Sequence, residues 1–223
     1  MFTFLKRKND PHLPDFVKRY QESCEQIDKK SSLNDLKFIC FDTESTSLDP
    51  TTAKLLSLGA VTIQNNRIDI KNNLDYYVRW NNKEKPQNVE IHGITNRQSQ
   101  KGVKPEDAIQ LFLEYIQGAV LVAHNVSFDV SMFNNILKKY YGSIKLTNPV
   151  LDTARLAIRL EVPQLDSNNY NAIDYTLDAL FDRYRITPLE RHSALGDAYG
   201  TGLLFMKLLS RLEKRGVSKL HQL

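Results

Sequence analysis

Short apolar runs rich in β-forming residues follow one another in the chain after residue 35. One run covers residues 36–42, and two further strand-like segments cover 54–64 and 67–80. Asn65-Asn66, between the second and third segments, is typical of a tight turn. The pattern therefore predicts a three-stranded antiparallel meander.

Beyond the meander the apolar spacing becomes helical, and helices alternate with short strands. A helix is predicted to start at Pro105 and to end at Gly118. The elements predicted after it are a strand at 119–123, a helix at 127–141, a strand near Val150, and helices at 153–160, 175–184 and 194–212. This alternation indicates an α/β protein.

The length of 223 residues fits one compact domain with an appendage better than two full domains. Residues 1–35 mix basic and acidic positions in an irregular helical pattern, and we interpret them as an N-terminal helical arm. The main domain is predicted to cover residues 36–213, followed by a basic C-terminal tail at 214–223. The polar, turn-rich residues 163–174 are predicted to form a surface loop.

The composition excludes a disordered or membrane-spanning chain, because 41% of the residues are hydrophobic, 25% are charged and the mean hydropathy is −0.42. The longest unbroken apolar stretch, Ala119 to Ala123, is far shorter than the roughly 18 residues of a membrane helix. The basic N-terminal sequence does not resemble a signal peptide, so we expect a cytoplasmic protein without membrane association. Cys24 and Cys40 form no C-x-x-C pair, which argues against a zinc knuckle or a disulfide framework.

The net charge of +4 is concentrated near the C-terminus. Residues 207–223 contain one acid, Glu213, and five cations, which are Lys207, Arg211, Lys214, Arg215 and Lys219. A basic edge on a neutral body would attract a polyanion such as nucleic acid. Cations that complement the dipole at a helix end are the alternative explanation, which charge alone favours.

Acidic residues stand at the ends of three predicted core elements. Asp42 and Glu44 are two positions apart at the end of the first strand, so their side chains can point the same way, although an acidic turn would give the same pattern. Asp129 heads the apolar stripe of the helix at 127–141. A buried carboxylate needs a cation or hydrogen-bond donors, but Asp129 could also cap its own helix.

Asp197 repeats this pattern in the last long helix, where it begins an apolar stripe. Small residues at every second position from 194 to 202 permit close packing of this helix, and His192 lies just ahead of it. A lone histidine at such a place is more often structural than catalytic. Three carboxylate sites at the ends of core elements nevertheless favour a shared cation. Oxygen ligands indicate Mg²⁺ or Mn²⁺, and two such ions would suit hydrolysis of a phosphodiester.

The motifs containing these residues resemble those of the DEDD exonuclease superfamily, in the branch that includes the proofreading subunit of bacterial DNA polymerase III. The three main motifs are Phe41-Asp42-Thr43-Glu44, His124-Asn125 through Phe128-Asp129, and His192-Ser193-Ala194 through Asp197-Ala198. They occur in the family's order, and the similarity extends over about residues 36 to 210 with further matches at 91–95, 151–153 and 175–180.

The resemblance implies a ribonuclease H-like fold, in which a mixed sheet of the antiparallel meander plus parallel strands is flanked by helices. It implies that two Mg²⁺ or Mn²⁺ ions bind to Asp42, Glu44, Asp129 and Asp197. It also makes His192 the general base, because a histidine five residues before the last acid marks the histidine subclass. The main domain, 36–213, would then be an exonuclease domain that releases nucleoside 5′-monophosphates from 3′ ends.

The resemblance also implies substrate contacts, at Thr43, Leu48, His92, Asn125 and Phe128. Packing explains Leu48 and His92 nearly as well, and Asn125 could merely fix its own turn. Ser47 stands where the family commonly has glycine, which bears on the fit of the terminal nucleotide rather than on metal binding. Tyr76, Tyr77 and Trp80 could stack on bases, but their place in a strand favours core packing.

The leading hypothesis is a metal-dependent 3′–5′ exonuclease that acts on single-stranded ends, with DNA favoured over RNA. An exoribonuclease that trims RNA is the alternative enzyme. Another alternative is a polymerase-associated subunit that binds nucleic acid without cutting it. Association with a DNA polymerase is a further alternative, but the sequence favours a free-standing or accessory nuclease. The run Gln110 to Leu113 lies in a predicted amphipathic helix, where core packing explains it better than binding to a sliding clamp.

Overall fold

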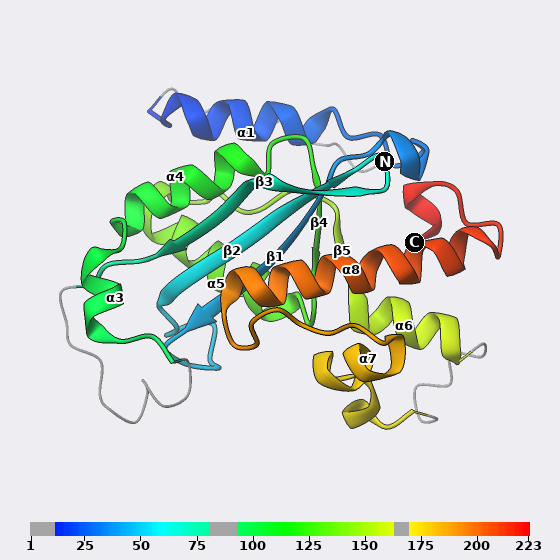
Figure 1. Ribbon diagram of the computed structural model, residues 1–223. Helices are drawn as coiled ribbons and strands as arrows, with labels where there is room; N and C mark the ends of the chain where they lie inside the picture. Colours follow the sequence, from blue (N-terminus) through cyan, green and yellow to red (C-terminus); the bar gives the residue numbers. More distant parts are fainter. Residues whose placement is uncertain (1–11, 81–92, 163–169) are drawn as a thin grey trace.

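The computed structural model describes residues 12–80, 93–162 and 170–223. Its centre is a five-stranded mixed sheet in the order β3-β2-β1-β4-β5 (Figure 1). The strands are β1 (Phe38–Ser45), β2 (Leu55–Gln64), β3 (Arg67–Tyr77), β4 (Val120–Ala123) and β5 (Val150–Asp152). β1, β2 and β3 pair antiparallel, whereas β4 and β5 extend the sheet in parallel from β1. The predicted meander and the predicted α/β class are confirmed.

The turn between β2 and β3 has the expected geometry, because Asn65 and Asn66 both adopt left-handed φ values, 51° and 56°. A two-residue turn with positive φ at both positions matches the twist of the strands that it joins, and asparagine tolerates this conformation.

Helices cover both faces of the sheet (Figure 1). They are α1 (Asp15–Glu25), α3 (Asn96–Lys101), α4 (Pro105–Tyr115), α5 (Ser127–Tyr141), α6 (Thr153–Glu161), α7 (Leu177–Tyr184) and α8 (Ala194–Glu213). Within the described residues, the short 3₁₀ helices are η1 (Leu33–Asp35), η2 (Ala172–Tyr175) and η3 (Leu220–Gln222). The sequence pattern did not predict α3. The helix η2 covers the end of the predicted loop, 163–174, and the first residue of the predicted helix, 175–184. The helix α7 itself starts at Leu177, after its N-cap residue Thr176.

The strand β1 contributes to both halves of the hydrophobic core. Phe38 and Cys40 pack into the cluster under α6, α7 and α8, whereas Ile39 and Phe41 pack into the cluster under α1, α4 and α5. Since successive side chains of a strand point to opposite faces, a strand between two helical layers must be apolar at every position. This explains the continuous apolar run that precedes Asp42.

Residues near both ends of the described chain pack against the domain. On α1, Val17, Tyr20 and Cys24 are buried, and the Tyr20 hydroxyl donates a hydrogen bond to Asn148 Oδ1 at 2.6 Å. At the other end, Leu220 is buried in η3 and the Arg159 guanidinium donates to the carbonyl oxygen of Gln222 at 2.6 Å.

Among the described residues, no helix combines the length and the apolar character that crossing a membrane requires.

Candidate active site

Three carboxylates meet where β1 ends. Asp42 and Glu44 lie on the last part of β1, and Asp197 lies in the first turn of α8. One oxygen from each lies within 4.8 Å of the others. Residues more than 150 positions apart are therefore brought together by the sheet and by the helix that crosses it, and the spacing of Asp42 and Glu44 places both on the same side of the strand.

Asp129 lies beside this group, in the first turn of α5, and its side chain is 7% exposed. The Thr43 hydroxyl donates a hydrogen bond to its Oδ1 at 2.5 Å, which links the second motif to the first. Val126, not Asp129, occupies the N-cap position of α5, and the Asp129 carboxylate interacts with its own backbone N–H in the first turn. Its oxygens do not belong to the close group of three, although its charge influences both acids of β1.

A glycine on the neighbouring strand allows Asp197 to reach Asp42. Gly59 is the β2 partner of Asp42 in the antiparallel register. A Cβ atom at Gly59 would lie 2.1 Å from the backbone nitrogen of Leu195, so only glycine permits the first turn of α8 to rest on the sheet here. Further along the helix, a Cβ at Gly200 would lie 2.5 Å from the ring of Phe181. The close packing predicted from the small residues of α8 is confirmed.

We expect Gly59→Ala to destabilise the protein by about 2 kcal/mol or more, because the methyl group must displace backbone atoms of α8. Gly202→Ala is the matched control. Its Cβ would meet only side chains at an ordinary 3.5 Å, and alanine favours a helix over glycine by up to about 1 kcal/mol. Urea denaturation measures both variants, and a Gly59→Ala protein as stable as Gly202→Ala would contradict this account of the packing.

Burial, with a smaller contribution from neighbouring acids, raises the pKa values of Asp42, Glu44 and Asp129. Burial, followed by the charges of Asp129, Asp197 and Glu44, raises the pKa of Asp42 well above its usual range. Burial is also the main cause that raises the pKa of Glu44 to about 7 and that of Asp129 to about 7. A group of acids that resist ionisation in this way is a site where added positive charge is strongly favoured.

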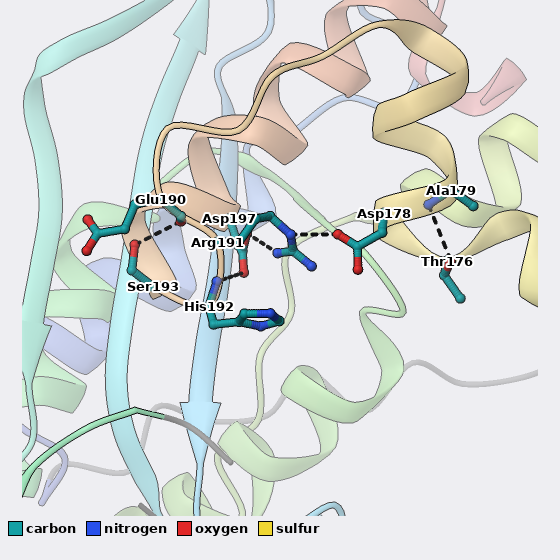
Figure 2. Close-up of polar contacts among 8 residues, drawn as sticks. All are labelled: Thr176, Asp178, Ala179, Glu190, Arg191, His192, Ser193 and Asp197. Atoms are coloured by element: carbon teal, nitrogen blue, oxygen red, sulfur yellow. Dashed lines mark hydrogen bonds and ion pairs between the residues drawn. The ribbon is translucent and has the colours of Figure 1, made fainter. Parts of the chain in front are cut away.

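Arg191 supplies part of that positive charge, and its role was not predicted from the sequence. Its guanidinium contacts Asp197 through Nη1 and pairs with Asp178 of α7 through Nε at 2.7 Å (Figure 2). It lowers the pKa of both Asp42 and Glu44 against the larger effects that raise them. In the sequence, only its position next to His192 pointed to the site. The ion pairs with Asp178 and Asp197 do not follow from any regular spacing within a helix or strand.

His192 lies at the entrance to α8 with its side chain exposed. Its backbone has a left-handed φ of 62°, and its backbone N–H donates to Asp197 Oδ2 at 3.1 Å (Figure 2). Ser193 then caps the helix, since its hydroxyl accepts from the backbone N–H of Gly196 at 3.1 Å. The main chain thus fixes the position of this histidine relative to Asp197 and leaves the imidazole accessible.

A cavity of about 490 Å³ opens beside the carboxylates. Its wall includes Glu44 and His192, together with Tyr77, Gly93 and Leu189. Leu189 is 80% exposed, so this cavity offers an apolar surface next to charged and hydrogen-bonding groups. Such a combination suits a ligand with both a flat apolar part and a polar part, as a nucleotide has.

The remaining predicted substrate contacts differ in their surroundings. Leu48 is 92% exposed in the loop after β1, so the packing explanation for it is wrong. Asn125 is exposed with a φ of 53°, and its carbonyl accepts from the Phe128 N–H at 3.3 Å, which means that it does form its own turn. Phe128 is partly buried against the core, and His92 lies outside the described residues.

Core packing is confirmed for Tyr76 and Trp80, whereas Tyr77 lines the cavity beside the carboxylates. Tyr76 is buried and its hydroxyl donates to the carbonyl of Ala108 at 2.9 Å. The Trp80 indole donates to the carbonyl of Leu55 at 2.7 Å, and its ring packs against the core.

Comparison with known families agrees with this arrangement. The sequence model of the RNase T family, described as exonuclease, matches residues 39–205. The chain belongs to this exonuclease family. The matched span begins in β1 and ends within α8, so it includes all four carboxylates and His192.

Two bacterial relatives of this exonuclease chain are DNA polymerase III proteins. The PolC-type protein of Caldanaerobacter subterraneus subsp. tengcongensis is 31% identical over 190 residues, which cover 84% of this chain and 12% of that protein. The epsilon subunit of Buchnera aphidicola is 31% identical over 183 residues, covering 78% of this chain and 73% of that one. The exonuclease chain thus spans only a small part of the PolC-type relatives.

Among solved structures, E. coli exonuclease I in complex with a dA16 oligonucleotide is similar with a TM-score of 0.64 and 18% identity. The match covers 80% of this exonuclease chain and 42% of that protein. Together with the mixed sheet and its flanking helices, the likeness confirms the predicted ribonuclease H-like fold.

Proposed function

We propose that this exonuclease works in the 3′–5′ direction, hydrolysing the terminal phosphodiester of nucleic acid and releasing nucleoside 5′-monophosphates. The observation that carries the proposal is the meeting of Asp42, Glu44 and Asp197 within 4.8 Å, with buried Asp129 beside them. The order of the three motifs, with His192 five residues before Asp197, supports the histidine subclass of the superfamily.

The donor set fits divalent cations. Every group in the cluster offers carboxylate oxygens, which Mg²⁺ and Mn²⁺ prefer, and the raised pKa values show that Arg191 alone does not balance the negative charge. Asp42, Glu44, Asp129 and Asp197 would hold the ions. When bound, two such ions supply activation of water and stabilisation of the departing oxygen of a phosphodiester.

The residues of the chain itself position the reactants and move the proton. The imidazole of His192, exposed beside Asp197, would accept the proton of the attacking water. The Thr43 hydroxyl holds the Asp129 carboxylate in a fixed orientation. Exposed Leu48, partly buried Phe128 and the amide of Asn125 would hold the terminal nucleotide, and the cavity of about 490 Å³ would receive part of the strand.

DNA is favoured as the substrate, because both named relatives are DNA polymerase III proteins, one of PolC type and one an epsilon subunit. For the same reason, association with a DNA polymerase is favoured over the free-standing nuclease expected from the sequence. The run Gln110 to Leu113 does not provide a free binding segment for such a partner. Phe112 and Leu113 are buried in the core, as core packing predicted. An exoribonuclease and a non-cutting subunit remain the two competing proposals.

The proposal is tested by digestion of matched single-stranded DNA and RNA oligonucleotides, labelled at either end, with Mn²⁺ or with EDTA. We expect a 5′ label to give a ladder that shortens from the 3′ end, a 3′ label to appear at once as a mononucleotide, and DNA to be degraded faster than RNA. Mononucleotides released first from the 5′ end would overturn the direction, and faster degradation of RNA would favour the exoribonuclease.

A further inference from the structure

A second charged region of the molecule lies away from the carboxylates. Five cationic side chains surround an open cavity of about 660 Å³ formed by α7 and the second half of α8, and we call this region the basic patch: Arg183, Arg185, Lys207, Arg211 and Lys214. All five side chains are exposed. No carboxylate is among the described residues that line this cavity.

The helix dipoles do not account for the basic patch. Arg183 and Arg211 do lie in the last turns of α7 and α8, where cations are favourable. Each helix end, however, carries only about half a negative charge, and the effect falls off within one turn. Lys207 lies six residues before the end of α8, and the two helix ends together offset only about one of the five positive charges.

Ion pairs offset little more of the charge. Arg183 pairs with Glu161 at 2.6 Å, and Arg211 lies over the ring of Tyr184 at 4.4 Å. Within the described part of the chain, Arg185, Lys207 and Lys214 form no ion pair. A concave surface with several unpaired cations is suited to a ligand that carries several negative charges.

The basic patch and the carboxylate site lie at opposite ends of the same two helices. Asp178, in the first turn of α7, pairs with Arg191 at the site, and Asp197 lies in the first turn of α8. At a rise of 1.5 Å per residue, Lys207 and Lys214 lie about 15 and 25 Å along α8 from Asp197. That separation corresponds to about four to seven base pairs of a duplex at 3.4 Å each.

The patch offers charge without a stacking surface. Its one aromatic ring, Tyr184, is 3% exposed and covered by Arg211. Single strands are usually held by bases stacking on aromatic rings, whereas a duplex hides its bases and presents phosphates. We infer that the basic patch binds the phosphate backbone of a duplex behind the 3′ end held at the carboxylates, an inference that rests on the proposed function.

The test uses the double variant Lys207→Gln/Lys214→Gln, which removes two positive charges from the basic patch. The matched control, Lys138→Gln/Lys145→Gln, removes two positive charges from exposed positions outside the patch, in the last turn of α5 and just beyond it. Fluorescence anisotropy in EDTA measures binding of a 20-base-pair duplex with a three-nucleotide 3′ overhang, and of its single strand. We expect the patch variant to bind the duplex about 10-fold more weakly at low salt. For the patch variant, the slope of log Kd against log salt concentration should be smaller by about 2. Each lost phosphate contact lowers this slope by about 0.9.

Hydrolysis of a p-nitrophenyl ester of thymidine 5′-monophosphate, which is too short to reach the patch, should be equal in the wild type and both variants. If the wild type hydrolyses neither this ester nor any oligonucleotide, the proposed function fails while the binding measurement still tests the patch. Unchanged duplex binding by the patch variant, an equal loss in the control variant, or an equal loss for the single strand would each overturn the inference.

Discussion

Replacement of Asp42 by asparagine will lower the rate of 3′-terminal hydrolysis by at least about 10³-fold at saturating Mn²⁺. Asp42 stands at the centre of the carboxylate cluster, since Glu44, Asp129 and Asp197 all raise its pKa. Loss of its charge weakens the cation site and removes several kcal/mol of charge stabilisation, and about 4 kcal/mol corresponds to a factor of 10³. Initial rates on a 5′-labelled oligonucleotide measure the effect.

The same variant should be more stable than the wild type when EDTA is present. A carboxyl group whose pKa is raised by folding costs stability as the pH increases above its unfolded pKa, because the folded state holds the proton more tightly. We therefore expect Asp42→Asn to gain about 2 kcal/mol at pH 7.5 and to lose this advantage towards pH 4. A rate within 10-fold of the wild type would contradict the assignment of Asp42.

Asp182→Asn is the matched control for both measurements. Asp182 is an exposed acid of α7 that is not part of the carboxylate cluster. Its replacement removes one negative charge without touching the site, so the rate and the stability in EDTA should stay close to those of the wild type. The contrast separates a local effect of Asp42 from a general effect of net charge.

The arrangement of the carboxylates could be predicted because each lies at a position that local periodicity defines. The two-residue spacing of Asp42 and Glu44 places them on one side of β1, and the helical spacing of the apolar residues behind Asp129 and Asp197 turns both acids inward. The resemblance to a known family then placed three separate elements around one point, which periodicity alone does not do.

The features that sequence did not reveal depend on contacts between distant segments. The need for glycine at position 59 arises only because β2 pairs with β1 in a register that sets Gly59 opposite Asp42, under the first turn of α8. Arg191 balances charge through Asp178, on another helix. The helix α3 is six residues long and shows no apolar stripe, so its capping box at Thr95 was its main signal.

Replacement of His192 by asparagine should reduce kcat by about 10² to 10⁴-fold, the range expected for loss of a general base. Asparagine suits this position because it tolerates the left-handed φ of 62° better than most residues. The contact with Asp197 Oδ2 comes from the backbone N–H and is therefore retained. Folding and the stabilisation by Mn²⁺ should be those of the wild type, so that the loss is confined to catalysis.

A comparison of kcat with KM distinguishes proton transfer from substrate binding. If His192 accepts the proton of the attacking water, kcat falls while KM changes little, whereas a residue that only holds the nucleotide would raise KM. His221→Asn is the control, because it removes an exposed imidazole that contacts the carbonyl of Lys29. The four carboxylates would be occupied by the metal ions, so none of them is free to replace the imidazole. A His192→Asn protein with the wild-type kcat would show that the proton leaves by another route.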